Sequence, residues 1–176
     1  MPDSTNKKVK VSKAQFAELL FHWLSGFLTE EAVKKTAKDI GFKVRSNKNF
    51  RRIYEELFLL NMWLTVYTCE IVIIDEDKRN GCLDKFHHLV YDRTIENKET
   101  NYIDFMMLIS SRYTEYGKAR EMEHPSTPLW VVANVFNKRL FGEIKNDLAF
   151  QTKVIVHQGL FVKHLGEAIA HYDIEW

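Results

Sequence analysis

Apolar residues recur at helical spacing along almost the whole chain. In the first such stretch, residues 12–25, they fall on one helical face: Phe16, Leu19, Leu20, Trp23 and Leu24. Ser12 and Gln15 have the spacing of a capping box, which predicts that this helix begins at Ser12. Gly26 follows the last apolar position and predicts its end.

The same periodicity, combined with start and stop signals, predicts six further helices. They cover residues 29–41, 50–74, 82–94, 101–120, 127–142 and 146–171. Gly41 followed by apolar Phe42 is typical of a Schellman stop, and Thr127 before Pro128 is typical of a helix start.

Turn-forming residues separate the predicted helices. Asn80-Gly81 predicts a turn between the third and fourth helices, because both residues tolerate left-handed backbone. The segment His124-Pro125-Ser126 predicts a break, and Asn146 predicts the cap of the last helix. No segment of the chain predicts a strand.

The most apolar segment runs for 18 residues from Leu57 to Ile74. It is almost long enough to cross a bilayer, but Asn61 and Glu70 lie within it, and a carboxylate at membrane depth costs several kcal/mol. A helix that is apolar on all sides is typical of the centre of a bundle. Integral membrane insertion is therefore disfavoured.

These patterns predict an all-α, single-domain helical bundle of about seven helices, with a central apolar helix near residues 50–74. Residues 1–11 are expected to form a flexible basic N-terminal tail, and residues 12–176 the domain. The length of 176 residues suits one domain.

Composition excludes several classes of protein. Hydrophobic residues make up 45% of the chain, with only 7 Gly and 3 Pro, which excludes a disordered or collagen-like chain. Two cysteines, Cys69 and Cys82, are too few for a disulfide scaffold. The apolar stretch near the N-terminus is interrupted by polar residues and does not fit a secretory signal, so we expect a cytoplasmic protein.

Charge is distributed unevenly, although the net charge is only +1. Residues 1–52 hold 12 basic and 5 acidic groups, whereas residues 53–176 hold 13 basic and 19 acidic groups. The basic groups are densest in residues 34–52, where the only acid is Asp39: Lys34, Lys35, Lys38, Lys43, Arg45, Lys48, Arg51 and Arg52.

Three interpretations of this basic segment stay open. It is a solvated face that complements the chain's own acidic part, a nucleic-acid surface, or a surface for anionic lipid or an acidic protein. The spacing of Ala37 and Gly41 partly resembles a helix–turn–helix motif. However, Asn47 occupies a position where that motif needs a buried aliphatic residue, and a loop-like segment follows Gly41.

Histidines and carboxylates offer a candidate metal site. His157, His164 and His171 are seven residues apart, too far for one ion to bridge without ligands from another helix. Glu121 and His124 have the Glu-x-x-His spacing of di-iron bundles, but only one copy is present. A metal site would therefore draw on some of a scattered set: His88, His157, His164 and Glu121. Ordinary packing and surface hydrogen bonds are the competing explanation for each of these residues.

No local motif of phosphate-binding, zinc-protease or serine-hydrolase chemistry is present in the sequence. The sequence therefore predicts a non-catalytic helical interaction module that binds another protein or itself, with no bound cofactor. One alternative is a nucleic-acid-binding protein that uses residues 34–52, and a second is a metal-dependent helical-bundle enzyme.

Overall fold

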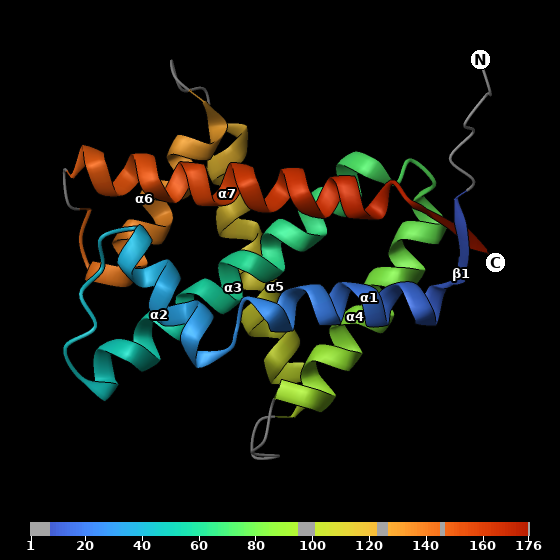
Figure 1. Ribbon diagram of the computed structural model, residues 1–176, viewed down its shortest axis with the longest axis horizontal. Coiled ribbons are helices and arrows are strands. Elements are labelled where there is room, and N and C mark those ends of the chain that lie inside the picture. Colours follow the sequence, from blue (N-terminus) through green and yellow to red (C-terminus); the bar gives the residue numbers. More distant parts are fainter. Residues whose placement is uncertain (1–7, 95–100, 123–126, 145–146, 176) are drawn as a thin grey trace.

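The computed structural model describes residues 8–94, 101–122, 127–144 and 147–175. Within these ranges the chain forms seven helices and two short strands (Figure 1). The helices are α1 (Lys13–Gly26), α2 (Glu30–Asp39), α3 (Asn47–Val72), α4 (Glu76–Thr94), α5 (Tyr102–Glu121), α6 (Pro128–Phe141) and α7 (Leu148–Ile169), and the strands are β1 (Val9–Ser12) and β2 (Tyr172–Glu175). The predicted all-α helical bundle is confirmed.

Helix α3 is the centre of the bundle. It has 26 residues and packs against all six other helices. Its middle is buried on every side, as Leu60, Met62 and Leu64 illustrate. The apolar run in the sequence therefore corresponds to a core helix, and among the described residues no helix is long and apolar enough to cross a membrane.

Two short strands bring the ends of the described chain together. Strands β1 and β2 pair in parallel, with Val9 opposite Tyr172 and Val11 opposite Ile174 (Figure 1). Val11 and Ile174 join the core, at 8% and 7% exposure. The expectation of no strand is therefore wrong. Residues 9–11, expected in a flexible tail, lie in β1, while residues 1–7 lie outside the described part of the chain.

Most predicted helix ends are confirmed by the backbone. Ser12 and Gln15 form both hydrogen bonds of the capping box. Thr127 caps α6 ahead of Pro128. The segment His124-Pro125-Ser126 and Asn146 lie outside the described residues, and Asp147 provides the cap of α7.

The predicted turn at Asn80-Gly81 is wrong, because both residues lie inside α4. The helix begins earlier, where the Asp75 carboxylate accepts a hydrogen bond from the Lys78 N–H at 3.0 Å. A Cβ on Gly81 would lie 3.0 Å from the Lys13 side chain of α1. This glycine therefore makes room for a neighbouring helix instead of forming a turn.

The connection between α2 and α3 is fixed at one end of the bundle. Gly41 has φ of +85°, and the Phe42 N–H donates to the Ala37 carbonyl at 2.7 Å, which confirms the Schellman stop. The Phe42 ring packs on Phe141 of α6, with 5.7 Å between ring centres. Phe141 packs in turn on Phe150 of α7. The loop is thus anchored to two helices distant in sequence.

Candidate interaction surface

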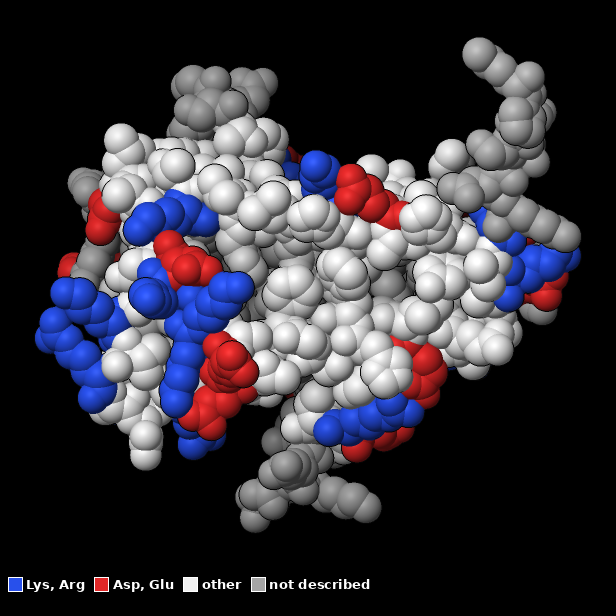
Figure 2. Space-filling model, viewed as in Figure 1, with Lys and Arg blue, Asp and Glu red and all other residues white. Residues whose placement is uncertain are grey.

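The cations of residues 34–52 gather at the end of the bundle that carries α2 and the start of α3 (Figure 2). All eight are exposed, and they come from α2, the following loop and the first turns of α3. Lys153 of α7 joins them, because its ammonium lies 3.7 Å from the point where a Cβ on Gly41 would be. We call these nine residues the basic end: Lys34, Lys35, Lys38, Lys43, Arg45, Lys48, Arg51, Arg52 and Lys153.

Three members of the basic end have partners close by. Lys34 pairs with Glu30, and Arg51 pairs with Glu55 at 2.9 Å. Arg52 donates to the backbone carbonyl of Arg139 at 3.0 Å. The other six have no acidic partner within the described part of the chain: Lys35, Lys38, Lys43, Arg45, Lys48 and Lys153.

The charges around the start of α3 oppose its helix dipole. Helix N-termini favour carboxylates, but the first turn of α3 contains no acidic residue. Lys43, Arg45 and Lys48 flank this terminus instead, and the cap is the neutral hydroxyl of Ser46. Such an arrangement lowers the stability of the helix end, and local conflicts of this kind are typical of binding surfaces.

A concavity of about 510 Å³ lies within the basic end. Its lining combines three lysines with apolar and glycine surface: Lys34, Lys38, Gly41, Phe42, Lys43 and Val44. The Lys34 ammonium also lies 5.8 Å from the centre of the Phe50 ring. The surface thus offers positive charge around a small apolar area.

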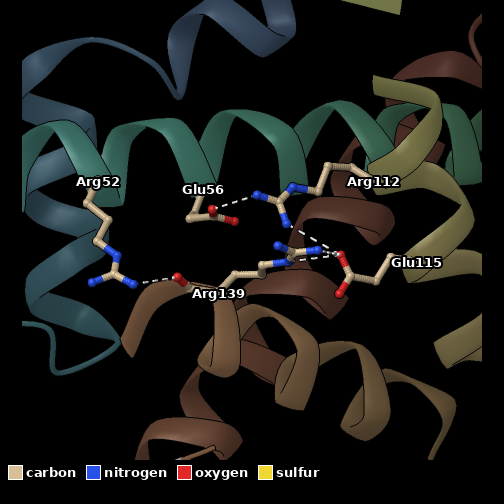
Figure 3. A network of polar contacts seen from close by, with 5 residues as sticks. All are labelled: Arg52, Glu56, Arg112, Glu115 and Arg139. Atoms are coloured by element: carbon tan, nitrogen blue, oxygen red, sulfur yellow. Dashed lines mark hydrogen bonds and ion pairs between the residues drawn. The ribbon is translucent and has the colours of Figure 1, made fainter. Parts of the chain in front are cut away.

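A buried polar network lies behind the basic end and ties α3 to α5 and α6 (Figure 3). Arg112 donates to Glu56 at 2.9 Å and to Glu115 at 3.4 Å. Arg139 donates to Glu115 at 2.7 Å, and its carbonyl accepts from Arg52. The network therefore holds the first turns of α3 against the C-terminal end of α6.

Burial dominates the electrostatics of this network. The side chains of Glu56 and Arg112 are only 10% and 12% exposed. Burial raises the pKa of Glu56, although Arg112 and Arg139 oppose the change. Glu56 Oε2, Arg112 Nε and the Tyr116 hydroxyl are buried without a hydrogen-bond partner in the part of the chain that the structure describes. This network was not predictable from the sequence, since no local spacing links Glu56 to helix α5.

The candidate metal ligands lie apart and have other surroundings. His157 of α7 shares a hydrogen bond with Asn61 Oδ1 at 3.0 Å, and burial lowers the pKa of its imidazole to about 4. His164 bonds Glu167 at 3.3 Å, and His88 stacks on Tyr102 with 4.2 Å between ring centres.

Glu121 is exposed at the end of α5, and its predicted partner His124 lies outside the described residues. Over the ranges that the structure describes, no group of three or more His, Cys, Asp or Glu side chains is arranged to hold a metal ion. The four candidate ligands are therefore not brought together.

Exposed apolar side chains form a second type of surface. On α5, Ile103 and Met107 are 69% and 66% exposed and border an open concavity of about 600 Å³. On α7, Val156 and Leu160 are also exposed. The centre of the face in Figure 2 carries few charges compared with the basic end.

Comparison with known proteins gives one distant similarity. The chain is 22% identical over 99 residues to a protein of Dictyostelium discoideum described as MOB kinase activator-like 1 homolog B. The match covers 55% of this chain and 46% of that protein, so the chain spans about half the length of the relative. No family model matches the chain, and no solved structure matches it significantly. A similarity of this extent does not establish membership of a family.

Proposed function

We propose that this chain is a non-catalytic helical module that binds an acidic segment of a partner protein through the basic end. The observation that carries the proposal is the gathering of six cations without acidic partners among the described residues, from α2, the following loop, α3 and α7. Like charges held together on a fixed surface repel one another, and an anionic partner relieves that repulsion.

The position of α3 favours a protein partner over nucleic acid. A recognition helix must expose one face along several turns to enter the major groove. The exposed face at the start of α3 ends at Glu55, and from Glu56 to Thr65 every residue except the partly exposed Phe58 is buried. Residues 34–52 partly resemble a helix–turn–helix motif, but α3 does not expose the long face that a DNA-reading helix needs.

Two further observations support a protein partner. The apolar part of the concavity, mainly the partly exposed Val44 together with Phe42 at 9% exposure, suits side chains of a peptide more than a phosphate backbone. The similarity to a kinase activator-like protein, a description that implies a protein partner, agrees with this choice.

Fluorescence anisotropy with three labelled probes tests the proposal. The probes are a short peptide rich in Asp and Glu, duplex DNA and single-stranded RNA, each titrated at about 50 and 200 mM salt. We expect the acidic peptide to bind with salt-dependent affinity. The double variant K43E/K48E should weaken its binding about tenfold or more, because both exposed cations flank the start of α3.

Lys163→Glu is the matched control. Lys163 is an exposed lysine of the same helix as Lys153, ten residues further along, or about 15 Å away along the axis. Its reversal should leave peptide binding unchanged. Binding of DNA or RNA without binding of the peptide would overturn the proposal in favour of a nucleic-acid partner. Absence of binding to all three probes at low salt would also overturn it.

A further inference from the structure

The concavity in the basic end differs from a simple patch of positive charge. Lys34 and Lys38 of α2 lie on its lining together with Lys43 of the loop; Val44, which is partly exposed, and Phe42, which is 9% exposed, contribute its apolar part. Its volume of about 510 Å³ falls within the range of about 300–1,000 Å³ that is typical of pockets for small ligands.

We propose that this pocket receives one large apolar side chain of the partner's acidic segment, so that the partner motif is an apolar residue flanked by carboxylates. This inference rests on the proposed function, since it specifies the partner of the same surface. A segment with carboxylates on both sides of an apolar residue complements the arrangement of lysines around Phe42 and Val44.

The pocket is held in place before a partner arrives. The backbone of Phe42 is fixed by its hydrogen bond to Ala37, and its ring packs on Phe141. Gly41 has no side chain, which keeps the space beside Lys153 open. A pocket that is already ordered loses little conformational entropy when a ligand binds, so the free energy of apolar contact there contributes directly to affinity.

A partner with charge alone leaves the apolar part of the pocket unused. Five lysines and one arginine without an acidic partner among the described residues attract any polyanion, and that attraction falls steeply with salt. Contact of an apolar side chain with Phe42 and Val44 adds a contribution that salt does not screen. Burial of one Leu-sized or Phe-sized side chain corresponds to about 10–100-fold in affinity.

Two peptides of equal length and charge test the inference on the unaltered protein. Each carries glutamates on both sides of a central position, which is leucine in one peptide and glycine in the other. We expect the leucine peptide to bind about tenfold or more tightly, with the ratio preserved when the salt concentration is raised. Equal binding of the two peptides would overturn the inference and leave the proposed function standing. Failure of both peptides to bind would overturn both.

A variant of the pocket gives an independent test. Val44 is partly exposed in the loop, and Val44→Asp should abolish the preference for leucine. Val156→Asp on the exposed face of α7 is the matched control, since Val156 is 53% exposed and does not line the pocket. Circular dichroism establishes that both variants keep their helices. A folded V44D variant that retains the preference would overturn the inference.

Discussion

Replacing Arg112 with methionine removes one cation from the buried network behind the basic end and leaves Glu56 without its ion-pair partner. Methionine keeps an unbranched side chain of similar length, so the change acts mainly on charge and hydrogen bonding. Arg112 also contacts Glu115, but that carboxylate keeps its bond to Arg139. The substitution thus isolates one carboxylate, that of Glu56.

The expected loss of unfolding free energy is about 3–5 kcal/mol, the usual cost of leaving one member of a buried pair alone. Only 10% of the Glu56 side chain is exposed, so water cannot replace the lost partner. Removing both charges, in E56M/R112M, should recover most of this loss, because no buried charge then remains. The difference between single and double variants measures the desolvation of Glu56.

The loss should depend on pH in a definite direction. Burial already raises the pKa of Glu56 from its ordinary value of 4.5, and removing Arg112 raises that pKa further. A folded state with a raised carboxyl pKa binds a proton that the unfolded state releases, so its stability falls as pH rises above about 4.5. Relative to the unaltered protein, the variant should therefore lose more stability at pH 8 than at pH 5.

Urea denaturation followed by tryptophan fluorescence at both pH values provides the measurement. Arg51→Met is the control, because it breaks an i,i+4 pair whose side chains are 83% and 56% exposed, and it should cost no more than about 0.5 kcal/mol. A loss below about 1 kcal/mol for R112M, or a loss independent of pH, would refute the account of a buried pair.

Three further predictions concern other parts of the fold. Burial lowers the pKa of His157 from 6.5 in the unfolded chain to about 4 in the fold. The free energy of unfolding should therefore decrease by up to about 3 kcal/mol as pH falls from about 6.5 to 4. NMR titration of the imidazole and denaturation at each pH would check this, and an imidazole that titrates near 6.5 in the folded protein would contradict it. Gly142→Ala should destabilise the protein by about 1 kcal/mol, because Gly142 ends α6 with φ of +86°. Gly159→Ala, inside α7, should instead stabilise it by up to about 1 kcal/mol. Thermal denaturation compares the two variants, and equal changes in melting temperature would count against the role of the left-handed backbone. Burial raises the pKa of Cys82 to about 11, and Cys69 is buried as well, so neither thiol should react with iodoacetamide at pH 8 unless the chain unfolds, which mass spectrometry would detect.

Helix ends were predictable from the sequence because their chemistry is local. The hydrogen bonds between Ser12 and Gln15 span three residues, and the stop at Gly41 and Phe42 depends on one turn of backbone. The central helix was predictable for a similar reason, since an apolar run without a polar face has to be buried. These features are encoded within a few positions of one another.

The errors arise where distant segments meet. Asn80-Gly81 has the composition of a turn, but the contact of Gly81 with Lys13 of α1 belongs to helix packing. Strand β1 has only 4 residues, and its partner lies at the other end of the chain. Such short strands have no pattern that distinguishes them from helix flanks.

The basic end was predictable in part. The eight cations of residues 34–52 lie so close together in the sequence that counting charges reveals the cluster, and all are exposed. Lys153 was missed because α7 brings it to Gly41 from more than a hundred residues away. The apolar part of the pocket was missed as well, since Phe42 and Val44 become a surface only through the loop that follows α2.

The excess of acidic residues in positions 53–176 suggested that the basic segment pairs with acidic groups of the same chain. Glu55 pairs with Arg51, but the other ion-paired carboxylates pair with cations outside the basic end. Within the described residues, Glu70 pairs with Arg120, and Glu175 pairs with Lys10. Glu115 pairs with Arg112 and Arg139. Within the described residues, Glu55 is the one carboxylate of residues 53–176 that pairs with a cation of the basic end, so the fold leaves most of this cluster without an internal counter-charge. A cluster of charge that the fold itself does not compensate contributes little to stability, which agrees with the contact that we propose between the basic end and an anionic partner.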